Sequence, residues 1–252
     1  MTAATVTLAV LAFYAFFYRV VVRHWGPAIE PLVERLGLAA TRSVREIEAI
    51  GKLAAAGVAQ ALFAAVLLLA LGTDLADIAG LDTGLLALGA VLGFGELALA
   101  SFLGTVAVRL DMLRSEGAAT AAWIAQGRGG WMGQFGATIA AAPKWVAAAS
   151  VSLYVAGEEL VFRGIVIDAT AGAGAVASVA LSLVLFMTAQ AFNMPSVRAA
   201  TFPIVGALVV GLVHGVLFWQ TFDLVPLIVA HLTFFGGVLA LNSGLRPAAG
   251  IP

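Results

Sequence analysis

The chain of 252 residues contains no cysteine, so it can form neither a disulfide nor a thiolate metal site, and it has no cysteine nucleophile. Charged residues are also scarce: they make up 11% of the chain, and the formal net charge is -1. Lysine and arginine form no stripe beyond the segments that flank apolar runs, so we expect no nucleic-acid partner. Any catalysis must therefore use carboxylates, imidazoles, amides or hydroxyls.

Apolar residues dominate what is present. They account for 62% of the chain, and the mean hydropathy is +1.05, values typical of a protein whose solvent is lipid. Runs of about 20 apolar residues, the length that crosses a bilayer core, occur at 3–22, 53–72, 85–107, 145–166, 172–191, 199–218 and 224–243. We therefore predict an all-α, polytopic transmembrane helical bundle of about seven or eight membrane helices.

Two polar connecting segments interrupt these runs. Residues 25–52 mix charged and apolar residues at spacings that favour an amphipathic helix on the membrane surface. Residues 110–143 contain Trp123 and Trp131, which suit the headgroup region, and this segment has room for an eighth, re-entrant helix. The basic residues of both segments predict that they face the cytoplasm, with the N-terminus outside and the C-terminus inside.

A pair of acidic residues, Glu158 and Glu159, lies within the fourth apolar run. Ionisable groups at membrane depth cost roughly 2.5 to 3.5 kcal/mol each on insertion scales. They usually persist because they pair, line a wet cavity or do chemistry. We therefore expect the functional site at this pair.

The spacing around the pair suggests different roles for the two acids. Glu159 and Arg163 lie four residues apart, so they share a helix face and can form an ion pair. Glu158 is rotated away from Arg163 and remains available as a general base toward water. In the alternative interpretation, Arg163 and Gly164 end the span, and both acids belong to a salt-bridge cluster close to the membrane interface.

The sequence from Glu158 to Gly164 resembles the Glu-Glu-x-x-x-Arg motif of the CPBP family, the CAAX-processing and bacteriocin-processing intramembrane proteases also called the Abi family. This resemblance implies a helical bundle with a conical intramembrane cavity in which peptide and water meet. It divides the chain into N-terminal membrane helices with interfacial segments over 1–143 and a CPBP/Abi-like protease core over 144–245.

The other two family motifs are incomplete. The family's Phe-x-x-x-His motif, whose histidine is thought to activate water with the first glutamate, corresponds to Phe186 and Gln190. A glutamine amide can hold a water molecule, but it cannot take or give a proton. The His-x-x-x-Asn motif, attributed to stabilisation of the oxyanion, corresponds to His231 and Phe235, and phenylalanine offers no hydrogen bond.

His214 lies in the sixth apolar run, at a position where the family pattern has an apolar residue. It can compensate for Gln190 by approaching Glu158, or it is a buried histidine that a neighbouring residue satisfies. The sequence contains no His-Glu-x-x-His pair, and the resemblance implies a metal-independent mechanism, so we expect no cofactor and consider bound zinc unlikely though not excluded.

The leading hypothesis is an intramembrane endopeptidase in a multi-pass bacterial plasma-membrane protein, acting on a peptide or membrane-protein substrate. In this hypothesis Glu158 deprotonates water, Gln190 orients the water, and His231 stabilises the oxyanion. Glu159 and Arg163 hold the helix in place, and His214 is a possible proton acceptor. The candidate catalytic residues are thus Glu158, Glu159, Arg163, Gln190, His214 and His231.

Two other classes of function remain open from the sequence. The loss of two motif residues allows a catalytically degenerate member that binds a peptide, as an immunity or membrane assembly factor. A transporter would instead need a polar path across several helices, reaching the lone acid Glu96 in the third apolar run. Convergence of Glu158, Gln190, His214 and His231 would support the enzyme.

Overall fold

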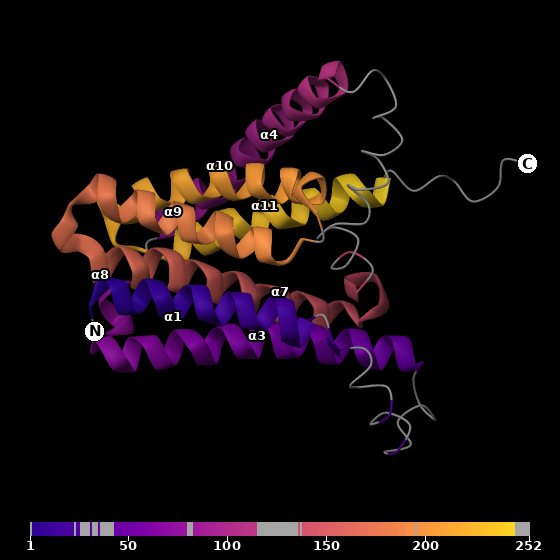
Figure 1. The fold of residues 1–252 in the computed structure, drawn as a ribbon, viewed down its shortest axis with the longest axis horizontal. Helices are drawn as coiled ribbons and strands as arrows, with labels where there is room; N and C mark the ends of the chain where they lie inside the picture. The colour runs from indigo at the N-terminus through magenta and orange to yellow at the C-terminus, as the bar shows by residue number, and fades with distance from the viewer. Residues whose placement is uncertain are drawn as a thin grey trace, which may run out of the picture.

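The computed structural model describes residues 2–22, 24–25, 31, 35, 43–79, 83–114, 136, 138–194 and 196–244, and the elements it defines there are helical (Figure 1). Helix α1 (Ala3–Phe16) continues as the π-helical segment η1 (Phe17–Val22), and α7 (Lys144–Glu159) continues as the π-helical segment η4 (Leu160–Ile167). The other long helices are α3 (Val44–Leu71), α4 (Thr83–Arg114), α9 (Ala175–Phe192), α10 (Val197–Thr221) and α11 (Val225–Gly244). Short helical turns are η3 (Leu75–Asp77), α8 (Asp168–Thr170) and η5 (Ala171–Ala173).

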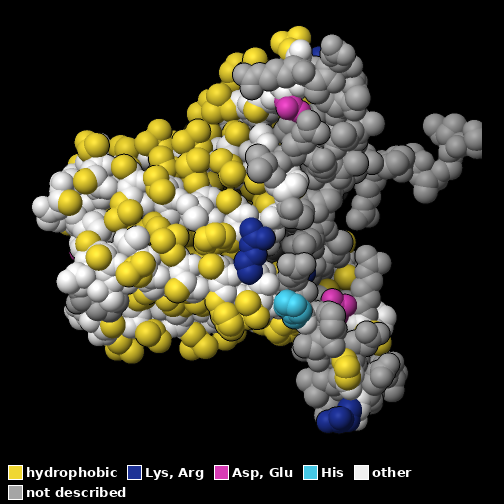
Figure 2. Space-filling view, viewed as in Figure 1, with side chains coloured by type: hydrophobic (Ala, Val, Ile, Leu, Met, Phe, Trp, Pro, Cys, Tyr) yellow, Lys and Arg dark blue, Asp and Glu magenta, His cyan; other side chains and the backbone are white. Residues whose placement is uncertain are grey.

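These helices make the chain a multi-pass membrane protein. Six of the described helices are long and apolar enough to cross a membrane, and Val225–Leu241 adds a shorter apolar helix. Each of the seven predicted runs coincides with one of these helices, so the all-α bundle is confirmed. Figure 2 shows hydrophobic side chains spread across the visible helical surface, with few charged ones among them. Strongly exposed apolar residues include Leu69 and Val176, as expected for a surface that lipid covers.

The second span begins earlier than the sequence suggested. We predicted a surface helix over 25–52, but α3 runs without interruption from Val44. The physical reason is a helix-start signal, because the Ser43 side chain caps the Glu46 amide at 3.2 Å, in the Ser-x-x-Glu spacing of a capping box. The rest of that segment lies largely outside the described residues. Of residues 110–143, in which an eighth helix was considered, 110–114 form the end of α4, while 115–135 and 137 lie outside the described residues.

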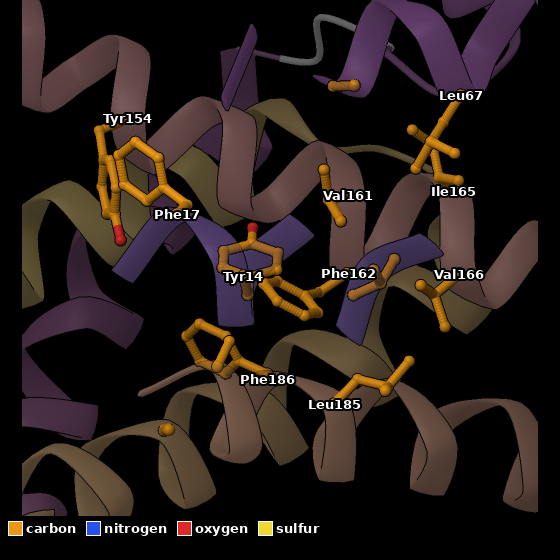
Figure 3. Packing of buried hydrophobic residues seen from close by; sticks show 14 of the residues in the cluster. Tyr14, Phe17, Leu67, Tyr154, Val161, Phe162, Ile165, Val166, Leu185 and Phe186 are labelled. Atoms are coloured by element: carbon orange, nitrogen blue, oxygen red, sulfur yellow. The ribbon is translucent and has the colours of Figure 1, made fainter. Parts of the chain in front are cut away.

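Helix α7 and its continuation η4 lie at the centre of the bundle (Figure 1). Helix α3 packs along α7, while α1, α9 and α10 contact η4, and α11 packs against α4 and α7. The core between α1, η4 and α9 contains Tyr14, Phe162, Leu185 and Phe186 (Figure 3). The arrangement therefore surrounds the end of α7, which carries the two glutamates, with side chains from most of the other helices.

Two glycines let α4 and α11 approach each other closely. A Cβ atom on Gly89 would lie 2.3 Å from the Pro226 carbonyl oxygen, and one on Gly93 would lie 2.3 Å from the Ala230 carbonyl oxygen. Small residues spaced four apart permit such contact between membrane helices. Because Ala230 precedes His231, this contact fixes the position of that histidine relative to the bundle.

Candidate active site

The paired glutamates lie at the transition from α-helical to π-helical backbone. Glu158 and Glu159 end α7, and Arg163 and Gly164 lie in η4. Turns of π-helix inside longer helices occur frequently at functional sites. The apolar helical run continues to Ala173, so Arg163 and Gly164 lie inside the span. The helix therefore does not end at Arg163 and Gly164, as the alternative interpretation assumed.

Basic side chains surround Glu159. Its Oε2 atom lies 3.3 Å from the Nε atom of Arg163 and 3.0 Å from Nδ1 of His214. Its Oε1 atom forms a hydrogen bond of 2.6 Å with Nδ1 of His231. Glu159 and Arg163 are both fully buried, so each offsets much of the cost of placing the other in an apolar interior. Glu159 thereby links its own helix to α10 and α11.

Neutral groups hold Glu158 instead. The Nε2 atom of Gln190 donates a hydrogen bond of 3.0 Å to Glu158 Oε1, and the Tyr154 side chain also hydrogen-bonds to this glutamate. The nearest basic atom described is Nε2 of His231, 3.9 Å from Glu158 Oε2. Glu158 is 2% exposed, while Gln190 and His231 are 8% and 7% exposed, so the site is closed and least covered on the side of these two residues.

His214 does not restore a pair with Glu158. Its Nδ1 atom lies 3.0 Å from Glu159 Oε2 and its Nε2 atom lies 3.0 Å from Glu96 Oε1, so the imidazole is placed between two buried carboxylates. The sequence allowed His214 to approach Glu158, but the structure pairs it with Glu159 and Glu96. The reason is that α10 packs against both α4 and η4, which places the imidazole between them. The same bridge gives Glu96 the partner that the sequence did not identify.

A comparison with models of known protein families gives a match to this part of the chain. Residues 140–235 match the model described as type II CAAX prenyl endopeptidase Rce1-like. This segment is an Rce1-like domain of the CPBP family. Neither a curated protein nor a solved structure matches the chain.

The Rce1-like domain includes every residue that we predicted as catalytic from the sequence, and the structure brings all of them together. The phenylalanine of its second motif packs beneath them: the Arg163 guanidinium lies 4.3 Å from the centre of the Phe186 ring, which is 6.1 Å from the His231 ring. Phe235, at the family's asparagine position, is buried. Gln190 and Phe235 thus stand at the positions of the family's second-motif histidine and third-motif asparagine.

Asn193 is the C-cap residue of α9, three residues after Gln190. Its Nδ2 atom is buried and makes no hydrogen bond within the described part of the protein. In the same ranges, no cluster of three or more histidine, aspartate or glutamate side chains is arranged to hold a metal ion.

Sequence reasoning missed two groups that touch the site. Glu96, on α4, was noted but left without a partner, because nothing in a sequence states which helices face each other. Tyr154 was overlooked, although it precedes Glu158 by four residues and therefore shares its helix face. That spacing was the signal available in the sequence.

Proposed function

We propose that this protein is an intramembrane endopeptidase in which Glu158 activates a water molecule. The observation that supports this proposal is the difference between the two adjacent acids. Glu159 is engaged by Arg163 and two imidazoles, whereas Glu158 has only neutral hydrogen-bond donors and a histidine at 3.9 Å. A buried carboxylate that is held mainly by neutral donors can accept a proton from water.

The reaction follows the usual course of amide hydrolysis. Glu158 removes a proton from water while the oxygen attacks the carbonyl carbon of the scissile peptide bond. The Gln190 amide orients this water, and His231 donates a hydrogen bond to the negative oxygen of the tetrahedral intermediate. The C–N bond then breaks, and protonated Glu158 gives its proton to the leaving amine. Glu159 and Arg163 act as positioning residues that hold the helix and His231.

The substrate we propose is a peptide or the tail of a membrane protein, processed in the plasma membrane of a bacterium. Secreted peptides and bacteriocin leaders fit this class. The site lies inside apolar helices, so the scissile bond must enter the bundle, and the side of Gln190 and His231 is the least covered route.

The test is a quantitative map of new peptide N-termini in host membranes and medium. We compare wild type, a deletion strain, Glu158→Gln and the control Ser152→Ala, which changes an exposed residue on the same helix. We expect a set of termini that disappears in the deletion and in Glu158→Gln but persists in Ser152→Ala. If the deletion has a phenotype that Glu158→Gln fully rescues, the protein is a peptide-binding family member without activity, as its Gln190 and Phe235 would allow.

A second candidate function, proton-coupled transport, is favoured by one observation. The contacts from Glu158 through His231, Glu159 and His214 reach Glu96, so polar groups on four helices form a connected path. Protein in liposomes that enclose a pH-sensitive dye tests this candidate. Transport predicts proton flux that Glu96→Gln abolishes, whereas an endopeptidase predicts no flux and cleavage that survives this substitution.

A further inference from the structure

All three tyrosines of the chain gather beside Glu158. Tyr14 and Tyr18 come from the N-terminal helix, Tyr154 comes from α7, and each is at least 96% buried. The Tyr14 and Tyr18 ring centres lie 5.9 Å apart, and Tyr154 belongs to the same buried cluster. A buried tyrosine hydroxyl normally requires a hydrogen-bond partner. The partners of these three hydroxyls therefore determine what the cluster does.

Two of the hydroxyls form a chain that ends at Glu158. The Tyr18 and Tyr154 hydroxyls are hydrogen-bonded to each other, and Tyr154 is hydrogen-bonded to Glu158. Each hydroxyl has one proton to donate. When Tyr154 donates to the carboxylate, its oxygen is left as an acceptor and Tyr18 must be the donor. The direction of the chain is then Tyr18 to Tyr154 to Glu158.

The third tyrosine belongs to a separate branch. The Tyr14 hydroxyl donates a hydrogen bond of 2.8 Å to the Oε1 atom of Gln60 on α3. This pair is as deeply buried as the other two tyrosines. Gln60 packs against Gly157, since a Cβ atom added to that glycine would lie 2.7 Å from Gln60 Cβ. Tyr14 therefore provides a matched control, a buried tyrosine on the same N-terminal helix whose hydrogen bond leads away from Glu158.

We propose that Tyr18, which lies outside the Rce1-like domain, is a positioning residue that acts through Tyr154 on Glu158. The inference rests on the proposed function, in which Glu158 is the base. Gln190 on α9 holds the Oε1 atom of Glu158. The hydrogen-bond chain from Tyr18 through Tyr154 adds a second restraint, which originates on η1. A carboxylate held by two sets of neutral donors keeps one orientation toward water, which proximity effects in catalysis require. The N-terminal helix is thereby part of the catalytic unit.

The first test needs no substrate. Because the chain has three tyrosines, labelling with ¹³Cζ-tyrosine gives three NMR resonances in liposomes, each assigned by its Tyr→Phe variant. Replacing Glu158 with glutamine should shift the Tyr154 resonance most, the Tyr18 resonance next and the Tyr14 resonance least, because Tyr14 is near Glu158 but outside its hydrogen-bond chain. Unchanged Tyr154 and Tyr18 resonances would overturn the proposal, whether or not the protein cleaves peptides.

The second test uses a peptide spanning a cleavage site found by N-terminal mapping. Tyr18→Phe removes the hydrogen bond that orients Tyr154, the donor to the base. We expect this variant to lower kcat about 10-fold with KM unchanged, while Tyr14→Phe stays within about twofold of wild type. Equal losses in both variants would mean that the tyrosines only support packing, and the proposal would be wrong. If Glu158→Gln leaves cleavage intact, the proposed function is wrong. The NMR experiment would still test the hydrogen-bond chain in that case, because it does not depend on cleavage.

Discussion

Glu158 and Glu159 are neighbours in sequence, yet they occupy two chemically different regions of the bundle. The Glu159 region contains Arg163, His214 and, behind it, Glu96, all with formal or potential charge. The Glu158 region contains the neutral donors Gln190 and Tyr154. His231 lies between the two regions, 2.6 Å from Glu159 and 3.9 Å from Glu158.

The difference arises from helix geometry. Successive residues on a helix point in directions about 100° apart, so adjacent side chains face different neighbouring helices. Here one direction leads to α10 and α4, and the other leads to α9 and η1. Two identical side chains can therefore serve separate purposes, one holding the bundle together and the other remaining available to react.

The largest expected effect is on the Glu159 region. Arg163→Met leaves a buried carboxylate without its guanidinium, which should lower the free energy of unfolding by about 3 to 5 kcal/mol. SDS titration in micelles measures this, with Lys144→Met as the control because Lys144 is exposed at the start of α7. Adding Glu159→Gln to Arg163→Met should recover part of the loss. If Arg163→Met lowered the free energy of unfolding by less than about 1 kcal/mol, the contact between Arg163 and Glu159 would not be important for stability.

The next effect concerns the Glu158 region. Gln190→His places an imidazole at the family's histidine position, next to Glu158 Oε1, and supplies the missing proton-transfer group. We expect cleavage of a mapped peptide to rise about 100-fold, the lower end of the range for such a group. Gln190→Leu, which removes the hydrogen bond without adding a base, should reduce cleavage. Equal rates for the histidine and leucine variants would argue that this position does not touch the reaction.

A packing variant tests how His231 comes to lie between the two regions. In Gly93→Ala the new Cβ atom would sit 2.3 Å from the Ala230 carbonyl oxygen, so α11 must move away from α4. Overpacking of this kind costs about 1 to 3 kcal/mol, and the shift should also reduce cleavage. Gly95→Ala is the control, because nothing lies within 4 Å of its added Cβ. Identical melting temperatures for the two variants would show that the close helix contact is unimportant.

The smallest effect is expected at the edge of the Glu159 region. Glu96→Gln keeps the shape of the side chain but weakens its contact with His214, so we expect a loss of about 1 kcal/mol in stability and nearly normal cleavage. Glu48→Gln, on the half-exposed first turns of α3, should change neither quantity. If Glu96→Gln abolished cleavage while Glu48→Gln did not, the separation between the two regions would be wrong.

Much of the site was predictable because it depends on local spacing. Glu159 and Arg163 are one helical turn apart, and the structure pairs them. The position of His214 was not predictable, since the imidazole bridges helices that are more than 50 residues distant in sequence. The start of α3 was misjudged because the charged residues after Ser43 suggested a surface helix, whereas the cap at Ser43 extends the span.

The sequence by itself determined the class of the protein, the positions of its apolar helices and the acidic pair on which the site is built. These follow from the length of apolar runs and from helical periodicity, both of which are local properties. Only the tertiary structure decided which partners each glutamate has, including the bridge from His214 to Glu96 and the link from Tyr18 to Glu158. Those contacts depend on how the helices pack, which is set by side chains distributed along the whole chain.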